Sequence, residues 1–282
     1  MKKIFLAASL AALLPLLFSC GKVKENSNNF EEPRFIQYAG QLVMRGDIAP
    51  AAAPASVPVA APAAVSVIEY IEFTESGLYV VGIRTDGETS YKAGKFTTTD
   101  GSVYACEGFG TVELSGSNPV NVTVKRNGGA TEVLKADFKK AAGSNVAYRG
   151  WTVDKTRVTV YGFNTPASAD FTGCNFQEIA KFLRDNGHEP GDVPSGSLQS
   201  VSFTGVGSII FAYSDGTANV GECTVSGASV NFSWRSTTRV FVIEGGKATI
   251  DYLDGKCILK IDAKLKNSTT SGSVTFVMSP MA

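Results

Sequence analysis

Histidine is almost absent from this chain, because His188 is the only one among 282 residues. It lies in the polar run Asn186–Pro190 (NGHEP), where a solvated loop histidine is the ordinary interpretation. The nucleophile elbow Gly-x-Ser-x-Gly is also missing, so a Ser-His-Asp hydrolase lacks its characteristic turn. No two cysteines have the spacing of a zinc site. We therefore expect no catalytic residue, no metal and no cofactor.

An excess of charge is also lacking. The chain has 26 basic and 26 acidic residues, and loss of the two leader lysines leaves 24 against 26, a net charge of −2. This balance excludes the basic surface typical of nucleic-acid-binding proteins, so no nucleic-acid partner is expected. Helical periodicity is sparse, whereas 29 glycines and many Ser, Thr and Val residues favour a mainly β class.

The N-terminus has the pattern of a leader. Two lysines precede the uncharged run Ile4–Phe18, which is short for a membrane span of about 20 residues. Leu17 and Ser19 stand three and one residues before Cys20, which resembles the recognition site of lipoprotein signal peptidase. We interpret residues 1–19 as a lipoprotein signal peptide; the alternative is an ordinary secretory signal with an accidental cysteine.

The interpretation of residues 1–19 as a lipoprotein signal peptide gives Cys20 a specific chemical role. Its thiol would carry the lipid, and two or more acyl chains of the palmitate type give stable membrane anchoring. Gly21 follows the cysteine in place of an aspartate, which favours the outer membrane under a sorting rule of some Gram-negative bacteria. Whether the protein faces the periplasm or the cell surface stays open, since Gly21–Glu25 is not an acidic cluster.

Residues 20–65 are expected to be a lipidated N-terminus and a disordered Ala/Pro-rich tether. Prolines recur at every fourth position from Pro50 to Pro62, and such spacing favours extended polyproline II over helix or sheet. The run Phe35–Val43 is mildly apolar and is a candidate to pack on a later domain.

Residues 66–148 have the pattern of a first β domain, an antiparallel meander or sandwich. Val120, Val122 and Val124 alternate with polar residues, as in a half-buried strand. Asp86-Gly87 is a strong hairpin signal between two such runs. A polar break at 142–145 marks the boundary to the next domain.

Residues 149–282 predict about eight further strands and one helix. Ile209, Phe211 and Tyr213 share one face of a strand, and Leu253–Lys256 (LDGK) is another hairpin turn. We expect a lipocalin-like barrel or a sandwich, and a barrel has the merit of removing sheet edges.

The one convincing helix is Phe176–Asn186. Its apolar residues at i, i+3, i+4 and i+7 form one face, and Asn175 is a plausible N-cap. Gly187 is a natural stop. A helix this short must dock on a sheet or plug a barrel mouth.

Four cysteines remain after Cys20, namely Cys106, Cys174, Cys223 and Cys257. Four cysteines allow three connectivities, and the sequence does not choose among them. Cys223 and Cys257 are the preferred candidate disulfide because both lie in strand-like runs of the C-terminal half. The alternative is that all four are small buried apolar residues.

The acidic residues are weak candidates for a catalytic site. Carboxylate pairs of glycosidases come from distant strands, so spacing distinguishes none of Glu72, Glu107, Glu178, Glu222 and Asp251.

The two tryptophans, Trp151 and Trp234, are the natural platforms for sugar stacking. Trp234 shares its face with Val230 and Phe232, and Trp151 begins a domain, so both are expected to be core residues.

Several segments between residues 70 and 282 resemble lipoproteins of Bacteroidetes that have a lipocalin-like C-terminal domain. These segments are Trp151–Arg157 (WTVDKTR), Ala169–Cys174 (ADFTGC), Ile209–Gly216 and Gly108–Val112 (GFGTV). That group is mostly of unknown function, so the resemblance implies an architecture and a location but no reaction.

The leading functional hypothesis is a non-enzymatic binding or interaction module on the outer membrane. Its partner would be a glycan, a small apolar ligand or an envelope protein. The alternatives are a structural or adhesive subunit of the fimbrial type and an uncharacterised hydrolase. An apolar cavity in the second barrel would favour ligand binding, an open edge strand would favour assembly, and clustered carboxylates would favour an enzyme.

Overall fold

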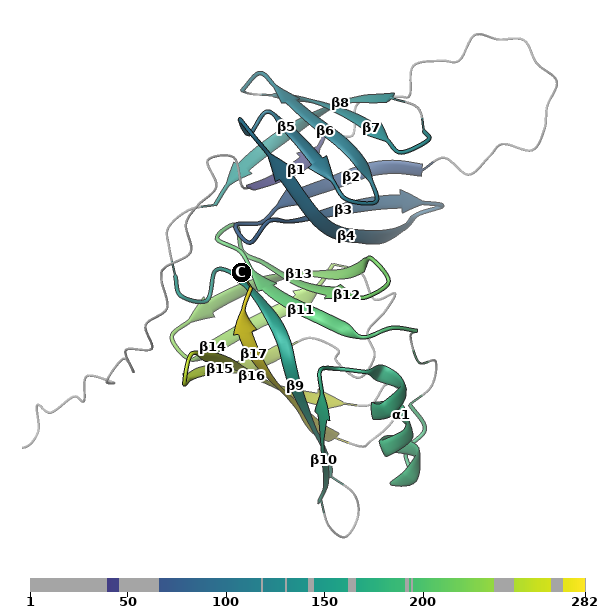
Figure 1. The fold of residues 1–282 in the computed structure, drawn as a ribbon, viewed down its shortest axis with the longest axis vertical. Helices are drawn as coiled ribbons and strands as arrows, with labels where there is room; N and C mark the ends of the chain where they lie inside the picture. Colours follow the sequence, from purple (N-terminus) through teal and green to yellow (C-terminus); the bar gives the residue numbers. More distant parts are fainter. Residues whose placement is uncertain are drawn as a thin grey trace, which may run out of the picture.

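The structure is a computed structural model that describes residues 40–45, 66–117, 119–129, 131–141, 145–161, 166–190, 193, 195–235, 246–264 and 271–281. This part of the chain is mainly β with one short helix, as predicted, and every strand pairing is antiparallel. The strands form two eight-stranded barrels that lie against each other, the first above the second in Figure 1.

The first barrel is a closed meander. Its strands are β1 (Gly40–Met44), β2 (Ser66–Phe73), β3 (Leu78–Thr85), β4 (Glu88–Thr98), β5 (Val103–Cys106), β6 (Gly110–Ser115), β7 (Val120–Arg126) and β8 (Thr131–Lys140). Each strand pairs with the next, and β1 closes the ring by pairing with both β2 and β8. The expected meander is therefore a barrel without an open edge.

The strand β1 lies inside the segment expected to be a tether. Leu42 of this strand is fully buried in the first core, so residues 40–44 belong to the folded part. This outcome corrects the tether boundary and agrees, for the described residues 40–43, with the expectation that Phe35–Val43 packs on a later domain; residues 35–39 lie outside the described part of the chain. The proline-rich run consequently connects β1 to β2 within one barrel, although residues 46–65 themselves lie outside the described part of the chain.

The second barrel contains β9 (Gly150–Tyr161), β10 (Pro166–Thr172), β11 (Leu198–Phe203), β12 (Ser208–Tyr213), β13 (Thr217–Ser226), β14 (Ser229–Trp234), β15 (Gly246–Leu253), β16 (Lys256–Lys264) and β17 (Ser271–Pro280). Strands β11 to β17 pair in order, and β9 closes the ring between β17 and β11. The remaining strand, β10, pairs with β9 and extends as a hairpin at the end far from the first barrel (Figure 1).

The single described helix, α1 (Phe176–Asp185), follows β10 and precedes β11 in the sequence. Asn175 caps it as predicted, because its side-chain oxygen accepts hydrogen bonds from the backbone of Gln177 and Glu178. Its buried face packs into the core of the second barrel through Ile179 and Leu183. The prediction that this helix docks on the barrel is confirmed.

Strands β3 and β12 are among those buried on both faces, which explains their nearly continuous apolar sequences. In β3, Tyr79 and Val81 point into the first barrel while Val80 points outward to the second. In β12, Ile209 points into the second barrel while Ile210 points toward the first.

The outward residues meet in a third cluster between the barrels, which we call the junction. It comprises Tyr70, Val80, Tyr91, Ala93, Ile210, Ala212, Ala218 and Val220. A short backbone pairing of β4 with β13 also crosses it, with Tyr91 opposite Ala218. The two barrels are therefore joined by both apolar packing and sheet hydrogen bonds.

Candidate functional site at the junction of the barrels

The interiors of both barrels are occupied by their own side chains. In the second barrel Trp151, Phe211 and Phe276 are almost fully buried within one large core. In the first, Phe73 and Tyr104 stack with their ring centres 3.8 Å apart. An apolar cavity in the second barrel would favour ligand binding, but core side chains pack together there. The clefts described below lie on the outer walls of the barrels.

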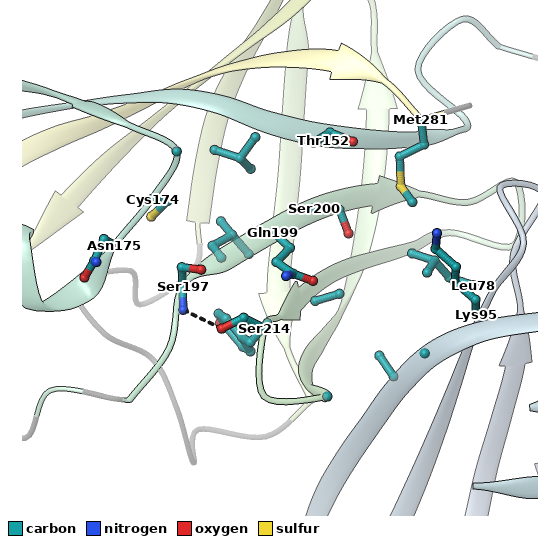
Figure 2. Close-up of a pocket in the computed structure, with 18 of the residues that line it drawn as sticks. Leu78, Lys95, Thr152, Cys174, Asn175, Ser197, Gln199, Ser200, Ser214 and Met281 are labelled. Carbon is teal, nitrogen blue, oxygen red and sulfur yellow. Dashed lines mark hydrogen bonds between the residues drawn. The ribbon is translucent and has the colours of Figure 1, made fainter. Parts of the chain in front are cut away.

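A cleft of about 810 Å³ lies beside the junction, and we call it the larger cleft (Figure 2). The first barrel contributes Leu78 and Lys95 to one wall. The second barrel contributes residues of β9, β11 and β12 and the entry into α1. The cleft therefore depends on both barrels.

The lining of the larger cleft combines neutral polar side chains with apolar ones such as Leu78, Leu198 and Met281. Besides Tyr213, its hydroxyl and amide side chains are Thr152, Thr172, Asn175, Ser197, Gln199, Ser200 and Ser214. Its charged residues are Lys95, Glu107 and Glu178. Neutral groups that both donate and accept hydrogen bonds are matched to a ligand rich in hydroxyl groups.

Hydrogen bonds fix one end of this cleft. The amide of Ser197 donates to the hydroxyl of Ser214 over 3.0 Å, and the amide of Ser214 donates to the carbonyl of Ser197 over 3.0 Å (Figure 2). Ser197 also forms an isolated bridge with Asn175, the cap of α1. The start of the helix is thereby tied to the β11–β12 hairpin before any ligand arrives.

A β-bulge in β11 shapes the middle of the cleft. Leu198 pairs with Tyr213 and Ser200 pairs with Ala212, so Gln199 is the extra residue. Bulges re-aim side chains near functional sites, and here the exposed Gln199 and its neighbour Ser200 both line the cleft. Ser200 is only 6% exposed, and no hydrogen bond of its hydroxyl is found within the described residues. This hydroxyl is available to a ligand.

A buried carboxyl lies deeper in the junction. The hydroxyl of Tyr70 donates to Glu72, which is 0% exposed, and the other carboxyl oxygen of Glu72 lacks a partner in the described residues. Burial raises the pKa of Glu72 above its ordinary value of 4.5, although Tyr70 and Thr204 oppose that rise. Glu72 is thus the one predicted carboxylate that the fold clearly distinguishes.

Glu75 is a second carboxyl where the barrels meet, and no sequence pattern singles it out. The amide of Gly205, from the second barrel, stands 3.5 Å from its oxygen. Burial raises the pKa of Glu75 to about 7. In the sequence, Glu75 stands out only as an acidic residue between two apolar strands. That pattern does not show which face of the first barrel the second barrel covers.

The other predicted acidic residues are dispersed. Glu107 and Glu178 line the larger cleft from opposite barrels, and Glu222 lies on the outer face of β13. Asp251 is exposed on β15. Among the described residues, no group of three or more His, Cys, Asp or Glu side chains is arranged to hold a metal ion.

The tryptophans are core residues as predicted, whereas His188 is half-buried and not fully solvated. Trp151 is fully buried and Trp234 packs against Phe211 and Phe232, so neither forms an exposed platform. His188 follows α1, and its backbone amide donates to the carbonyl of Leu183.

The preferred disulfide is not formed. Cys106, Cys174, Cys223 and Cys257 are all free thiols. Cys223 lies on β13 and Cys257 on β16, with β14 and β15 between them. Three strand spacings measure about 14 Å along the wall, beyond the roughly 7 Å between Cα atoms that a disulfide tolerates. The alternative, small buried residues, fits Cys106, Cys174 and Cys257.

The lipid-attachment residue Cys20 and the recognition residues Leu17 and Ser19 lie outside the described residues. No helix in the described ranges has the length and apolar character needed to cross a membrane. No protein-family model matches the chain, and no curated protein matches it.

Proposed function

We propose that this chain is an outer-membrane lipoprotein that binds a neutral, hydroxyl-rich ligand of the glycan class, without catalysing a reaction. The observation that carries this proposal is the larger cleft, with neutral polar side chains in its lining (Figure 2). Its volume of about 810 Å³ falls within the range of roughly 300–1,000 Å³ typical of ligand sites.

The rigidity of the walls supports binding. Sites on strands are held more accurately than sites on loops, and ligand affinity benefits when the site is formed in advance. Here the walls are strands of two closed barrels joined by the β4–β13 pairing. Ligand binding therefore costs little conformational entropy of the protein.

The anchoring part of the proposal rests on Cys20. With β1 in the first barrel, 19 residues separate Cys20 from Gly40. A fully extended chain spans about 3.3 Å per residue, so the barrels are held at most about 65 Å from the lipid. The linker between the lipid and the first barrel is therefore shorter than a tether that included the proline-rich run.

The fimbrial-type alternative has less support. Both barrels are closed rings within the described residues, which leaves β10 as the strand paired on one side only. Its sequence, PASADFT, begins with proline and carries Asp170. Proline and charge are devices that discourage strand addition at an edge.

A glycan array probed with the whole chain in detergent tests the proposal. The whole chain is required because a fragment from residue 66 would lack β1. We expect binding to neutral glycans that is weakened about tenfold by the double substitution Gln199→Ala with Ser200→Val, since two hydrogen bonds contribute roughly 1.4 kcal/mol or more. Asn121→Ala, on the outer face of β7, is the matched control. Absence of glycan binding, or equal binding by the double variant, would refute the proposal.

A further inference from the structure

A second cleft, of about 720 Å³, opens along the junction between different strands. Gln41 and Lys139 of the first barrel form one wall, and residues of β13, β14 and β15 form the other. It shares no lining residue with the larger cleft. We call it the basic cleft.

The first-barrel wall is a single cross-strand row. Lys139 on β8 is opposite Gln41 on β1, and Gln41 is opposite Glu72 on β2. Opposite residues of antiparallel strands share a face, and this face is outward because Leu42 and Ala136 point into the first core. The row leads from the exposed Lys139 to the fully buried Glu72.

The second-barrel wall repeats this arrangement. Thr224 is opposite Asn231, and Asn231 is opposite Lys247, in a row across β13, β14 and β15. Their neighbours Val230 and Ala248 are in the core, so this row also faces outward. The two rows bring a lysine from each barrel to one cleft.

The charge of Lys139 and Lys247 is offset by no ion pair within the described residues, although Asp262 lines a further pocket together with Lys247. Neither lysine side chain makes a hydrogen bond with any described residue. Arg235 is offset by Glu222 at 3.5 Å. Burial raises the pKa of Glu72 behind them, which favours its neutral form. Two like charges at one cleft repel each other, and an anionic ligand would relieve this repulsion.

Gln41 supplies an independent observation. Its side chain is 2% exposed and lines the basic cleft, and its amide nitrogen has no acceptor in good hydrogen-bond geometry within the described residues, although Gln41 also interacts with the Tyr70 hydroxyl. A buried donor without an acceptor costs free energy, so such a group indicates a position for a ligand acceptor.

We propose that the basic cleft binds an acidic saccharide, whose carboxylate or phosphate contacts Lys139 and Lys247. The neutral side chains of Thr224, Asn231 and Ser233 then face the sugar hydroxyl groups. The volume exceeds what a lone inorganic anion needs, which is why a sugar is the ligand and not the ion alone. This site is separate from the glycan site of the larger cleft.

Calorimetric titration of the whole chain in detergent tests the site with glucuronic acid, glucose 6-phosphate, glucose and inorganic phosphate. We expect binding of one or both charged sugars and no binding of glucose. The double substitution Lys139→Gln with Lys247→Gln should reduce the affinity about tenfold, which corresponds to roughly 1.4 kcal/mol. Raised salt should weaken the wild-type affinity, because it screens exposed charges. The two charged sugars distinguish a carboxylate ligand from a phosphate ligand.

The matched control is Lys135→Gln, on the same strand and outward face as Lys139 but outside the cleft. It should bind as the wild type does, and all variants should keep the wild-type melting temperature. The proposal is overturned if no charged sugar binds, if the double variant binds equally well, or if inorganic phosphate binds as tightly as glucose 6-phosphate. The variant Gln199→Ala with Ser200→Val should retain this binding, which separates failure here from failure of the larger cleft.

Discussion

Tyr70 donates its hydroxyl hydrogen to the buried carboxyl of Glu72 where the two barrels meet. Both residues belong to β2, and Arg235 of the second barrel stands over the Tyr70 ring at 4.8 Å. The pair is thus covered by the partner barrel. Separation of the barrels would expose this pair to water, where its hydrogen bond would compete with hydrogen bonds to solvent.

Removing the Tyr70 hydroxyl should destabilise the chain. Tyr70→Phe leaves a buried carboxyl oxygen without its donor, at a cost of about 1–3 kcal/mol in the free energy of unfolding. Tyr91→Phe is the matched control, because Tyr91 lies in the same cluster without a side-chain hydrogen bond among the described residues. Urea unfolding followed by circular dichroism measures both. Equal losses for the two variants would contradict the assigned role of the Tyr70 hydroxyl.

Stability should fall as the pH rises through the range set by Glu75. Its pKa is about 7 in the folded chain against an ordinary value of 4.5. Between these values the folded chain binds more protons than the unfolded chain, so the free energy of unfolding decreases with rising pH. The raised pKa of Glu72 acts in the same direction. Unfolding midpoints measured at steps from about pH 4.5 to about pH 7 should therefore decrease as the pH rises.

The variant Glu75→Gln isolates this contribution. A glutamine cannot ionise, so its stability should depend less on pH over the same range. Glu88→Gln, at the exposed β3–β4 hairpin, serves as the control and should retain the wild-type slope. A wild-type slope in Glu75→Gln would show that the pH dependence arises elsewhere.

The four described cysteines should resist thiol reagents in the folded chain. Burial raises the pKa of Cys174 to about 11 and that of Cys106 and Cys223 to about 12, and it also raises the pKa of Cys257. Because the thiolate is the reactive form, labelling at neutral pH should be slow until denaturant is added. Gel mobility should be the same with and without reductant. Rapid labelling, or a mobility shift on reduction, would contradict free thiols with raised pKa values, of which Cys223 is half-buried and the other three are buried.

Local patterns predicted the strands and the helix because their causes are local. Alternating Val120, Val122 and Val124 are indeed buried while the residues between them face outward. Asp86 and Gly87 both have positive φ, at 53° and 86°, as the predicted hairpin turn requires. Asn175 needs only its next few residues to cap a helix.

The junction and its clefts could not be predicted in the same way, because they depend on which outward faces meet. The nearly continuous apolar sequence of β3 indicates that another part of the protein covers the outer face of the first barrel. It does not identify β12 as the cover. The role of Gln41 was hidden for a further reason, since a five-residue strand beside a proline-rich run has too little pattern to register as part of a barrel.

The short strand β1 should nevertheless be essential to the first barrel. Leu42→Ala removes a fully buried side chain and should cost about 2–5 kcal/mol. Val43→Ala changes the next residue, which faces outward and is 37% exposed, and should cost much less. Thermal unfolding of the two variants makes the comparison. Equal stability would mean that β1 does not contribute to the barrel in solution.

Lipidation of Cys20 has a direct test by mass spectrometry of the membrane fraction. The wild-type chain should begin at Cys20 and carry acyl chains, because processing requires the thiol to form its thioether before cleavage. Cys20→Ala should yield neither an acylated nor a cleaved form, whereas Cys106→Ala, in the first core, should be processed normally. Two or more acyl chains give stable anchoring, so only chains with Cys20 should stay with the membrane after a salt wash. A lipidated, membrane-bound product from Cys20→Ala would overturn the assignment.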